Sequence, residues 1–330
     1  MKNKLNVLSL FNGMSTGHTA LENVGIKVGK YYSSEIKPVA IKLTQHHYPD
    51  TIQLGDVSKW KEWDIDWKSI DMVLSGSPCQ DLSIAGKRKG LEGERSGLFF
   101  VFVDILNHIK ELNPSVLFLQ ENVGSAPKKD VGIMSRELGV YPVRINSSLV
   151  TAQLRDRYYW TNIRTAPDGM FGDIVTDIPQ PKDKKIMFKD IVQGGAVKVD
   201  KSVCLAERTI ASASYKDLFS EKAQKFLKER EKKSMMSLVY VDKDKHNALV
   251  VNAGHPSKCQ ESLKKRNKTT GMVTLIEEEG KVRTVNKVEM CRLQGFPDDW
   301  CDILTMNQAG SLLGDGWTLP IIEHIFKYIK

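Results

Sequence analysis

The sequence predicts an α/β protein built on a mostly parallel sheet, with a second, smaller lobe. From the N-terminus to about residue 163, apolar runs of strand length alternate with amphipathic stretches, which is the rhythm of βαβ units. That rhythm stops near residue 168 and returns only in the last part of the chain. A chain of 330 residues is long enough to bury one full α/β core and still form a second domain.

The individual elements follow from the spacing of apolar residues. The predicted strands are short apolar runs at residues 5–10, 28–34, 71–75, 116–120 and 158–163. Residues 98–111 predict a helix, because apolar side chains recur there at three- and four-residue spacing. A C-terminal helix is expected to carry Pro320 in its first turn and to bury an apolar stripe made of Leu319, Ile322, Ile325 and Phe326.

Prolines and glycines crowd residues 167–181, and this change of texture indicates a domain boundary. We therefore expect a first domain at 1–166, a second domain at 167–284, and a helical segment at 285–330. The middle part contains two basic stretches. Residues 222–233 have the composition of a solvated helix, whereas residues 264–268 are the better candidate for phosphate contacts.

Composition excludes several classes of protein. No apolar stretch is long enough to cross a membrane, and the N-terminus lacks the apolar region of a secretory signal, so a cytoplasmic location is expected. The five cysteines include no Cys-x-x-Cys pair, which argues against a zinc site or a disulfide framework. The formal net charge of +8 favours a polyanionic partner such as nucleic acid.

The most informative stretch is Gly76-Ser77-Pro78-Cys79, which follows the predicted strand at 71–75. Open α/β sheets place their active sites at the carboxyl ends of strands. A thiol held there beside a proline can attack an electron-poor carbon, because it is the best neutral-pH nucleophile that a side chain offers. The alternative is a buried structural cysteine, which is the commoner fate of a free thiol.

A second stretch points to a nucleotide-like ligand. The run Phe11-Asn12-Gly13-Met14 follows the first predicted strand, where glycine lets backbone N–H groups approach a ligand closely. Glu35 follows the second strand, where an acidic residue accepts hydrogen bonds from ribose hydroxyls. Enzymes that use nicotinamide cofactors and enzymes that use methyl donors share both features.

Further motifs occur in an order typical of one family: Glu121-Asn122-Val123, Gln153-Leu154-Arg155-Asp156-Arg157 and Gly314-Asp315-Gly316-Trp317. Together with Phe11-Asn12-Gly13-Met14 and Pro78-Cys79-Gln80, they make the chain resemble the DNA cytosine-5 methyltransferases. The residues in and around these motifs are most similar to the branch that contains the animal de novo enzymes. The resemblance implies the Rossmann-like, mostly parallel sheet of a class I S-adenosylmethionine-dependent methyltransferase. It also implies that residues 1–166 form the catalytic and cofactor-binding domain, that residues 167–284 form the target-recognition domain, and that residues 285–330 return to the first domain.

The resemblance also implies a binding site for S-adenosylmethionine, which leaves as S-adenosylhomocysteine, and no metal. Glu35 would bind the ribose, Asp56 the adenine amine, and Phe11 and Val57 the adenine ring. The full set of implied cofactor contacts is Phe11, Asn12, Gly13, Met14, Thr16, Glu35, Ile36, Asp56, Val57, Pro78, Asp315, Gly316 and Trp317. The chain departs from many relatives at Asn12, where they carry Asp or Ala, and at Asp315-Gly316, where many bacterial members carry Asn-Ser.

The catalytic residues expected from the resemblance are Cys79, Glu121, Arg155 and Arg157. Cys79 would add to C6 of a flipped cytosine, and Glu121 would hold a proton for N3 while it accepts from the 4-amino group. Arg157 would bind the cytosine O2, and Arg155 would support the catalytic loop or a phosphate. Because the two arginines alternate along an extended segment, both are expected on one face. The loop 80–97, with its glycines and basic residues, is expected to close over the base.

The expected partner is double-stranded DNA, with a cognate restriction endonuclease as a further candidate and with nucleoid association in a prokaryote. One alternative is a tRNA cytosine-5 methyltransferase. Another is a catalytically silent DNA-binding accessory protein of the same fold, which would be expected to lose the nucleophile. A nicotinamide oxidoreductase accounts for Gly13 and Glu35 but leaves Cys79, Glu121 and Arg157 unexplained.

Overall fold

A computed structural model describes most of the chain. It covers residues 4–78, 97–169, 172–197, 199–205, 221–232, 239–240, 249–250, 273–274 and 282–329. The chain forms two compact units, each made of segments that are distant in sequence. The first unit comprises residues 1–147, 156–182 and 317–330, and the second comprises residues 148–155 and 183–316.

The first unit contains a seven-stranded sheet in the order β3-β2-β1-β4-β5-β8-β6. Its strands are β1 (Leu5–Leu10), β2 (Val28–Ser34), β3 (Ile52–Gln53), β4 (Met72–Ser75), β5 (Leu117–Val123), β6 (Val143–Asn146) and β8 (Asp156–Thr161). Strands β1 to β5 are parallel to one another, whereas β8 runs antiparallel to both β5 and β6. The predicted α/β class with a mostly parallel sheet is therefore confirmed.

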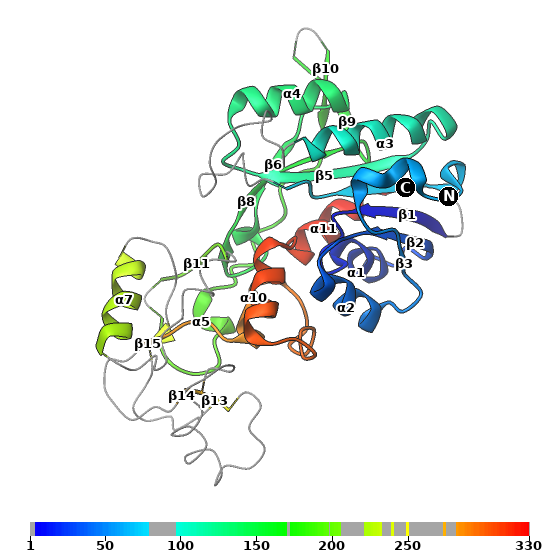
Figure 1. Cartoon of the computed structure of the whole chain (residues 1–330). Coiled ribbons are helices and arrows are strands. Elements are labelled where there is room, and N and C mark those ends of the chain that lie inside the picture. The colour runs from blue at the N-terminus through cyan, green and yellow to red at the C-terminus, as the bar shows by residue number, and fades with distance from the viewer. Residues whose placement is uncertain are drawn as a thin grey trace. The chain divides into compact units, whose positions relative to one another are not determined.

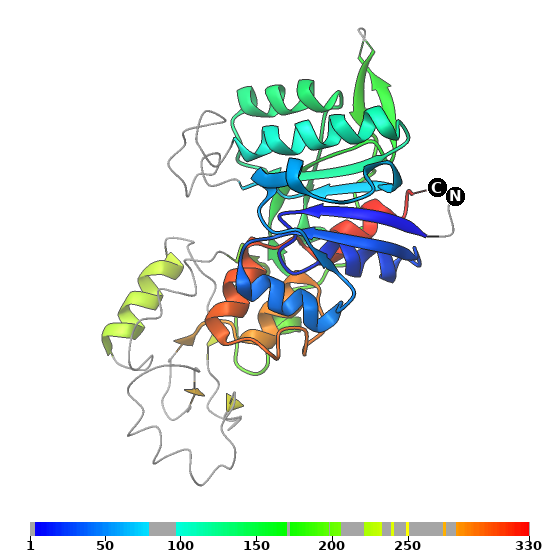
Figure 2. The same ribbon diagram turned by 45° about the vertical axis from the view of Figure 1, so that its right-hand side comes forward.

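Helices cover both faces of this sheet (Figures 1 and 2). Helices α3 (Leu98–Leu112) and α4 (Lys128–Leu138) lie on one face, and α1 (Thr16–Asn23) and α11 (Leu319–Phe326) lie on the other. The remaining elements of this unit are α2 (Pro38–His47), the 3-10 helices η1 (Val57–Glu62) and η2 (Trp67–Ser69), and the hairpin of β9 (Thr165–Asp168) and β10 (Asp173–Thr176). A sheet covered on both faces needs strands that are apolar throughout, and β4 is buried along its whole length.

The core between the sheet and α3 explains the helix predicted at 98–111. Phe102, Ile105, Leu106 and Ile109 recur at helical spacing and are buried against strand residues such as Val73. On the other face, α11 packs against α1, as expected, and buries Leu319, Ile321, Ile322, Ile325 and Phe326. Pro320 lies in the first turn of α11, where its missing N–H costs nothing.

The second unit has shorter elements. They are β7 (Gln153–Leu154), α5 (Phe188–Ile191), β11 (Ser202–Val203), α7 (Glu221–Lys232), β12 (Val239–Tyr240), β13 (Leu249–Val250), β14 (Val273–Thr274), β15 (Val282–Arg283), α9 (Lys287–Gln294) and α10 (Met306–Asp315). Its strands pair two by two, as β11 with β7, β12 with β15, and β13 with β14. The 3-10 helix η4 (Ser147–Leu149) lies at the junction of the units in the sequence.

The two units are divided at other positions than the predicted domains. The β9–β10 hairpin belongs to the first unit, and α9 and α10 belong to the second, so that only residues 317–330 return to the sheet. The predicted domains at 1–166, 167–284 and 285–330, with the functions expected of them, stay a prediction. The basic stretch at 222–233 is helical, as α7, whereas residues 264–268 lie outside the described residues.

Candidate functional site

The turn after β1 is held from inside by polar side chains. Phe11, Gly13 and Ser15 all have left-handed backbone angles, with φ of 56°, 57° and 60°. The buried Asn12 amide donates to Ser15 Oγ (2.8 Å) and Thr44 Oγ1 (3.2 Å) and accepts from the Tyr31 hydroxyl (3.1 Å). Two of these residues carry side chains that disfavour such angles, and the network offsets that strain. Any role of Asn12 toward a ligand is therefore left to its backbone.

Glu35 joins the end of β2 to this turn. Its Oε2 accepts from the Gly13 N–H (2.8 Å), and its Oε1 accepts from the N–H groups of Ile36 (2.8 Å) and Lys37 (2.9 Å). A carboxylate offers about four acceptor positions, so one remains for a ligand hydroxyl. A methyl group on Gly13 would meet only Phe11 O, at 3.9 Å, so the backbone of the turn is open on that side among the described residues.

The segment after β3 contributes the next predicted contacts. Asp56 is exposed, and its Oδ1 accepts from the Ser58 N–H (2.9 Å) at the start of η1. That hydrogen bond lowers the pKa of the Asp56 carboxyl and keeps it ionised. Val57 is buried in the core cluster against which Phe11 packs. The carboxyl ends of β1, β2 and β3 thus carry Phe11, Glu35 and the pair Asp56 and Val57.

Three further predicted contacts are close to these ends in the sequence. Met14 is fully buried, and Thr16 is the buried first residue of α1. Ile36 is 69% exposed, so its side chain is free to contact a ligand. Pro78 is half-buried at the end of the segment that follows β4.

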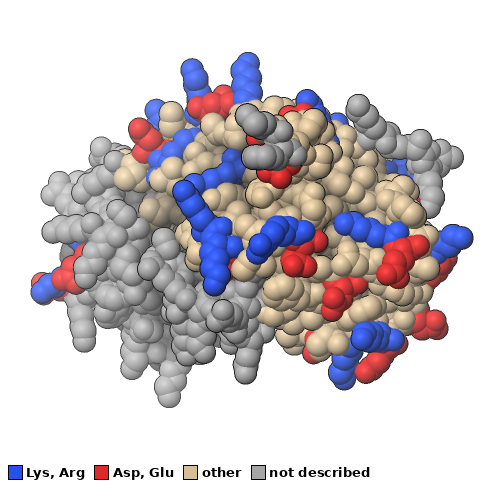
Figure 3. All heavy atoms as spheres, turned by 90° about the horizontal axis from the view of Figure 1, so that it is seen from above, with Lys and Arg blue, Asp and Glu red and all other residues tan. Residues whose placement is uncertain are grey.

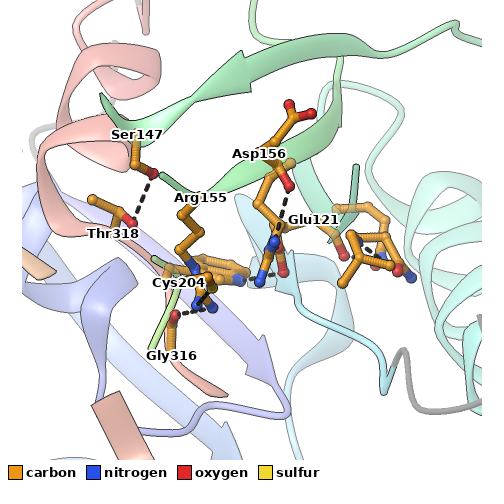
Figure 4. Close-up of polar contacts among 12 residues, drawn as sticks. Glu121, Ser147, Arg155, Asp156, Cys204, Gly316 and Thr318 are labelled. Carbon is orange, nitrogen blue, oxygen red and sulfur yellow. Dashed lines mark hydrogen bonds and ion pairs between the residues drawn. The ribbon is translucent and has the colours of Figure 1, made fainter. Parts of the chain in front are cut away.

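Glu121 lies at the centre of a second polar group in the first unit (Figure 4). Its Oε1 is 2.8 Å from Arg157 Nε, and its Oε2 accepts from the indole N–H of Trp317 at 3.1 Å. The side chains of Arg157 and Glu121 are only 15% and 12% exposed, so the ion pair is little screened by solvent. Each carboxylate oxygen therefore has its own donor, and both bonds are of the strong, charge-assisted kind.

The strand pairing explains why these residues meet. Val123 pairs with Arg157, and Glu121 pairs with Tyr159, in the antiparallel ladder of β5 and β8. We predicted that the strand would end before Glu121, but β5 continues to Val123, because the pairing with β8 extends it. On the other side of β5, Gln120 pairs with Ser75 and donates to Ser77 Oγ at 3.0 Å.

Gly76 has a role that the sequence did not reveal. A Cβ atom at this position would lie 2.8 Å from Trp317 Nε1, which is too close for a side chain. Its φ is not left-handed, so the requirement for glycine comes from the contact with the indole and not from the backbone. A glycine after a strand carries no signal of such a contact in the sequence.

The predicted nucleophile, Cys79, lies outside the described residues, as does Gln80. The described segment before it ends at Pro78, just beyond β4, and the described chain resumes at Gly97, before α3. The predicted closing loop at 80–97 therefore stays a prediction.

Arg155 is used inside the second unit. It lies between β7 and β8 in the sequence and is only 3% exposed. Its Nη1 donates to Gly314 O (3.0 Å), Leu205 O (3.5 Å) and Cys204 Sγ (3.1 Å). Its Nη2 donates to Gly316 O (2.8 Å), and Figure 4 shows Arg155 beside Gly316. The guanidinium thus satisfies carbonyls at the C-terminal end of α10, where a cation is favoured. The exposed Asp315 lies between these two carbonyls in the sequence.

A buried ion pair in the second unit also escaped the sequence analysis. Arg283 and the fully buried Glu289 are joined by two contacts of 2.7 Å, and Glu289 also accepts from the N–H groups of Gln193 and Asn286. Asn286 and Glu289 form a capping box at the start of α9. The spacing of Asn and Glu three residues apart before a helix was a readable signal for this network.

Neither a metal-binding group nor a membrane-spanning helix occurs among the described residues. Among those residues, no group of three or more His, Cys, Asp or Glu side chains is placed to hold a metal ion. Within the same part of the chain, no helix has the length and apolar character needed to span a membrane.

The sequence model of the family described as C-5 cytosine-specific DNA methylase matches residues 5–330. The orphan methyltransferase M.SPRI of Bacillus phage SPR is 32% identical over 262 residues, which are 75% of this chain and 54% of that protein. The Type II methyltransferase M.HpaII of Haemophilus parainfluenzae is 26% identical over 347 residues, covering 100% of this chain and 90% of that protein. The chain thus spans about half the length of the phage relative.

Solved structures with the same fold include two methyltransferases. The Dnmt2 methyltransferase of S. pombe aligns with a TM-score of 0.58 at 15% identity, over 99% of this chain and 98% of that one. The methyltransferase EhMeth of Entamoeba histolytica aligns with a TM-score of 0.59 at 13% identity, over the same shares. At such identities the likeness concerns the fold alone. The match of the family model over nearly the whole chain shows that this protein belongs to the C-5 cytosine-specific DNA methylase family.

Proposed function

We propose that this protein is a DNA (cytosine-5-)-methyltransferase that methylates C5 of a cytosine flipped out of duplex DNA. The observation that carries the proposal is the Glu121 carboxylate, held by Arg157 and Trp317 at the carboxyl end of β5. Strand β4 is the parallel neighbour of β5 and ends at Ser75, four residues before Cys79. A nucleophile and an acid on adjacent strand ends are what addition to a pyrimidine ring requires.

The residues at the ends of β1, β2 and β3 fit S-adenosylmethionine. Glu35 has acceptor capacity for a ribose hydroxyl, and the turn at Gly13 is open. Phe11, which packs against the core cluster that contains Val57, offers apolar surface for an adenine ring. When bound, S-adenosylmethionine supplies the methyl group and leaves as S-adenosylhomocysteine. The roles of Asp315 and Gly316 toward it rest on the family resemblance.

The protein's own residues would prepare the cytosine ring. Glu121 takes up a proton from solvent when Arg157 turns from it to the cytosine O2. The thiolate of Cys79 then forms a bond to C6 while the Glu121 carboxylic acid donates that proton to N3, and this makes C5 nucleophilic. The other oxygen of Glu121 accepts from the 4-amino group, and Arg157 donates to O2. After C5 is methylated, it loses its proton to a base, N3 returns its proton, and the S–C6 bond breaks to restore the thiolate.

The proposed substrate is double-stranded DNA, because C6 is inaccessible in a stacked helix and the base must be extruded at a cost of a few kcal/mol. The net charge of +8 supports a polyanionic partner. In the view of Figure 3, basic and acidic side chains are interspersed over the described surface, so charge alone marks no DNA-binding face there. A cognate restriction endonuclease is the second proposed partner.

Covalent trapping tests the proposal directly. Duplex DNA in which every cytosine is replaced by 5-fluorocytosine offers all sequence contexts. Its C5 carries fluorine in place of the hydrogen that a base must remove before the S–C6 bond can break. The wild-type protein with S-adenosylmethionine should give an adduct that survives denaturation. Cys79→Ala should give none, and Glu121→Gln should trap about a hundredfold more slowly or worse, because an amide cannot donate the proton.

Cys204→Ala is the matched control, since it removes another thiol while Arg155 keeps its carbonyl acceptors. It should trap like the wild type. An adduct that forms equally with Cys79→Ala would refute the proposed nucleophile. An adduct with 5-fluorocytosine-substituted tRNA and none with DNA would instead establish the tRNA alternative.

A further inference from the structure

The indole of Trp317 contacts the Glu121 carboxylate, although the family resemblance assigns Trp317 only to the methyl donor. Its N–H donates to Oε2 at 3.1 Å, while Arg157 Nε lies 2.8 Å from Oε1. An indole N–H can only donate, so it requires Oε2 to act as an acceptor. The contact therefore makes Oε2 of Glu121 different from Oε1. The proposed role of Glu121 needs this difference, because one oxygen donates a proton and the other accepts a hydrogen bond.

The position of the indole is determined on two sides. The absence of a side chain at Gly76 lets the ring approach the backbone after β4, where a Cβ atom would lie 2.8 Å from Nε1 and 3.3 Å from Cε2. The next residue, Thr318, is buried and accepts from Ser147 Oγ at 2.9 Å, as Figure 4 shows. Thr318 leads directly into α11, which packs against α1. These contacts determine the direction in which the N–H of Trp317 points.

We propose that Trp317 is a positioning residue that orients Glu121 for catalysis, an inference that rests on the proposed methyltransferase function. With Oε2 held as an acceptor for Trp317, its remaining lone pair faces the cytosine 4-amino group. Oε1 is then the oxygen that carries the proton for N3, once Arg157 turns from it to the cytosine O2. Without the indole N–H, the carboxyl group could rotate and present either oxygen to the base.

The test is the steady-state kinetics of Trp317→Phe with S-adenosylmethionine and duplex DNA. Phenylalanine keeps an aromatic ring but removes the N–H together with the rest of the five-membered ring, part of which contacts Gly76. The same loss of ring atoms therefore has to occur in the control. We expect kcat to fall about tenfold, as for the loss of one hydrogen bond to a charged group, with the KM for S-adenosylmethionine within about twofold of the wild type. Trp63→Phe is the matched control, because the buried Trp63 N–H has no hydrogen-bond partner among the described residues. It should leave both constants unchanged.

A double-mutant cycle keeps the test independent of any loss of folding. In the Glu121→Gln background, Trp317→Phe should cost clearly less than it does alone, because its effect acts through the carboxyl group. An equal cost in both backgrounds, an unchanged kcat, or a raised KM with unchanged kcat would each overturn the inference. Failure of the proposed function has a different signature, because the wild-type protein would then form no adduct with 5-fluorocytosine DNA.

Discussion

At the scale of single residues, His18 shows how burial changes the chemistry of a side chain. Its imidazole stacks between two tyrosines, at 4.5 Å from the ring of Tyr31 and 3.8 Å from that of Tyr48. Burial lowers the pKa of His18 from 6.5 to about 4, because a charged imidazolium would lose its hydration. The same burial raises the pKa of both tyrosines. His18 is therefore neutral at physiological pH.

This shift predicts a loss of stability in acid. Below pH 6.5 the unfolded chain binds a proton at His18, whereas the folded chain binds it only below about pH 4. Between these two pH values the unfolded state holds more protons. The free energy of unfolding therefore falls as the pH falls through this range. Between about pH 7 and about pH 4.5, the wild type should lose on the order of 2 kcal/mol more than His18→Phe. Urea denaturation of both proteins at both pH values measures the difference. Equal losses would show that folding does not lower the pKa of His18.

At the scale of elements, the packing of α1 depends on a glycine. A Cβ atom at Gly17 would lie 2.3 Å from Leu74 Cδ1 in β4 and 3.4 Å from the Tyr31 hydroxyl in β2. Leu74 is fully buried, so its side chain has little room to withdraw. Gly132, in α4, is different, because a Cβ atom there would meet nothing within 4 Å. Close packing thus requires a glycine at position 17, whereas position 132 has room for a larger side chain.

Alanine substitutions should separate them. Gly17→Ala should lower the free energy of unfolding by about 1–3 kcal/mol through overpacking. Gly132→Ala should raise it by about 0.5–1 kcal/mol, because alanine loses less backbone entropy in a helix. Both residues lie in the first unit, so chemical denaturation reports them on the same transition. The packing interpretation fails if the two variants change stability in the same direction.

The elements also show what sequence periodicity could predict. Strands β1 and β2, helix α3 and helix α11 occur where the apolar spacing placed them, because each buries a face that is legible locally. The extension of β5 through Glu121 was not legible, since polar residues continue that strand only because β8 pairs with them. Likewise, the contact of Trp317 with Glu121 depends on residues 196 positions apart and on the bare backbone of Gly76.

The contacts of Arg155 could not be predicted from the sequence. Simple alternation along an extended segment placed it on the same face as Arg157, but the strand is interrupted at residue 155 between β7 and β8. Its guanidinium meets carbonyls of residues 205, 314 and 316, which no local pattern relates to it. The prediction that it supports the catalytic loop or a phosphate is therefore untested, whereas its contacts to the end of α10 were not foreseen.

At the scale of the whole molecule, the first unit is completed by the end of the chain. The unit is interrupted after residues 147 and 182, and it regains residues 317–330 only at the end. Five apolar side chains of α11 are buried, and each contributes about 1.5–3 kcal/mol. Their sum is on the order of 10 kcal/mol, which is comparable to the net stability of a typical domain.

Removing residues 317–330 should therefore unfold the first unit. Circular dichroism and limited proteolysis should show lost helix and rapid cleavage within residues 4–147. The substitution Ile325→Asp should act in the same way, because it places a charge at a fully buried position. Lys327→Asp, at the exposed position two residues further on, should remain folded. A truncated chain with native-like helix content and resistance to proteolysis would contradict this account of α11.

The reversed direction of β8 has a consequence for how such a site can change. In a parallel sheet only the last residues of each strand reach the active edge, but a strand of opposite direction contributes its first residues there. Arg157, the second residue of β8, meets the end of β5 for this reason. Because side chains alternate along a strand, inserting one residue ahead of Tyr159 would turn this arginine to the opposite side of the sheet. The spacing between Arg157 and Tyr159 should consequently tolerate substitution far better than insertion or deletion.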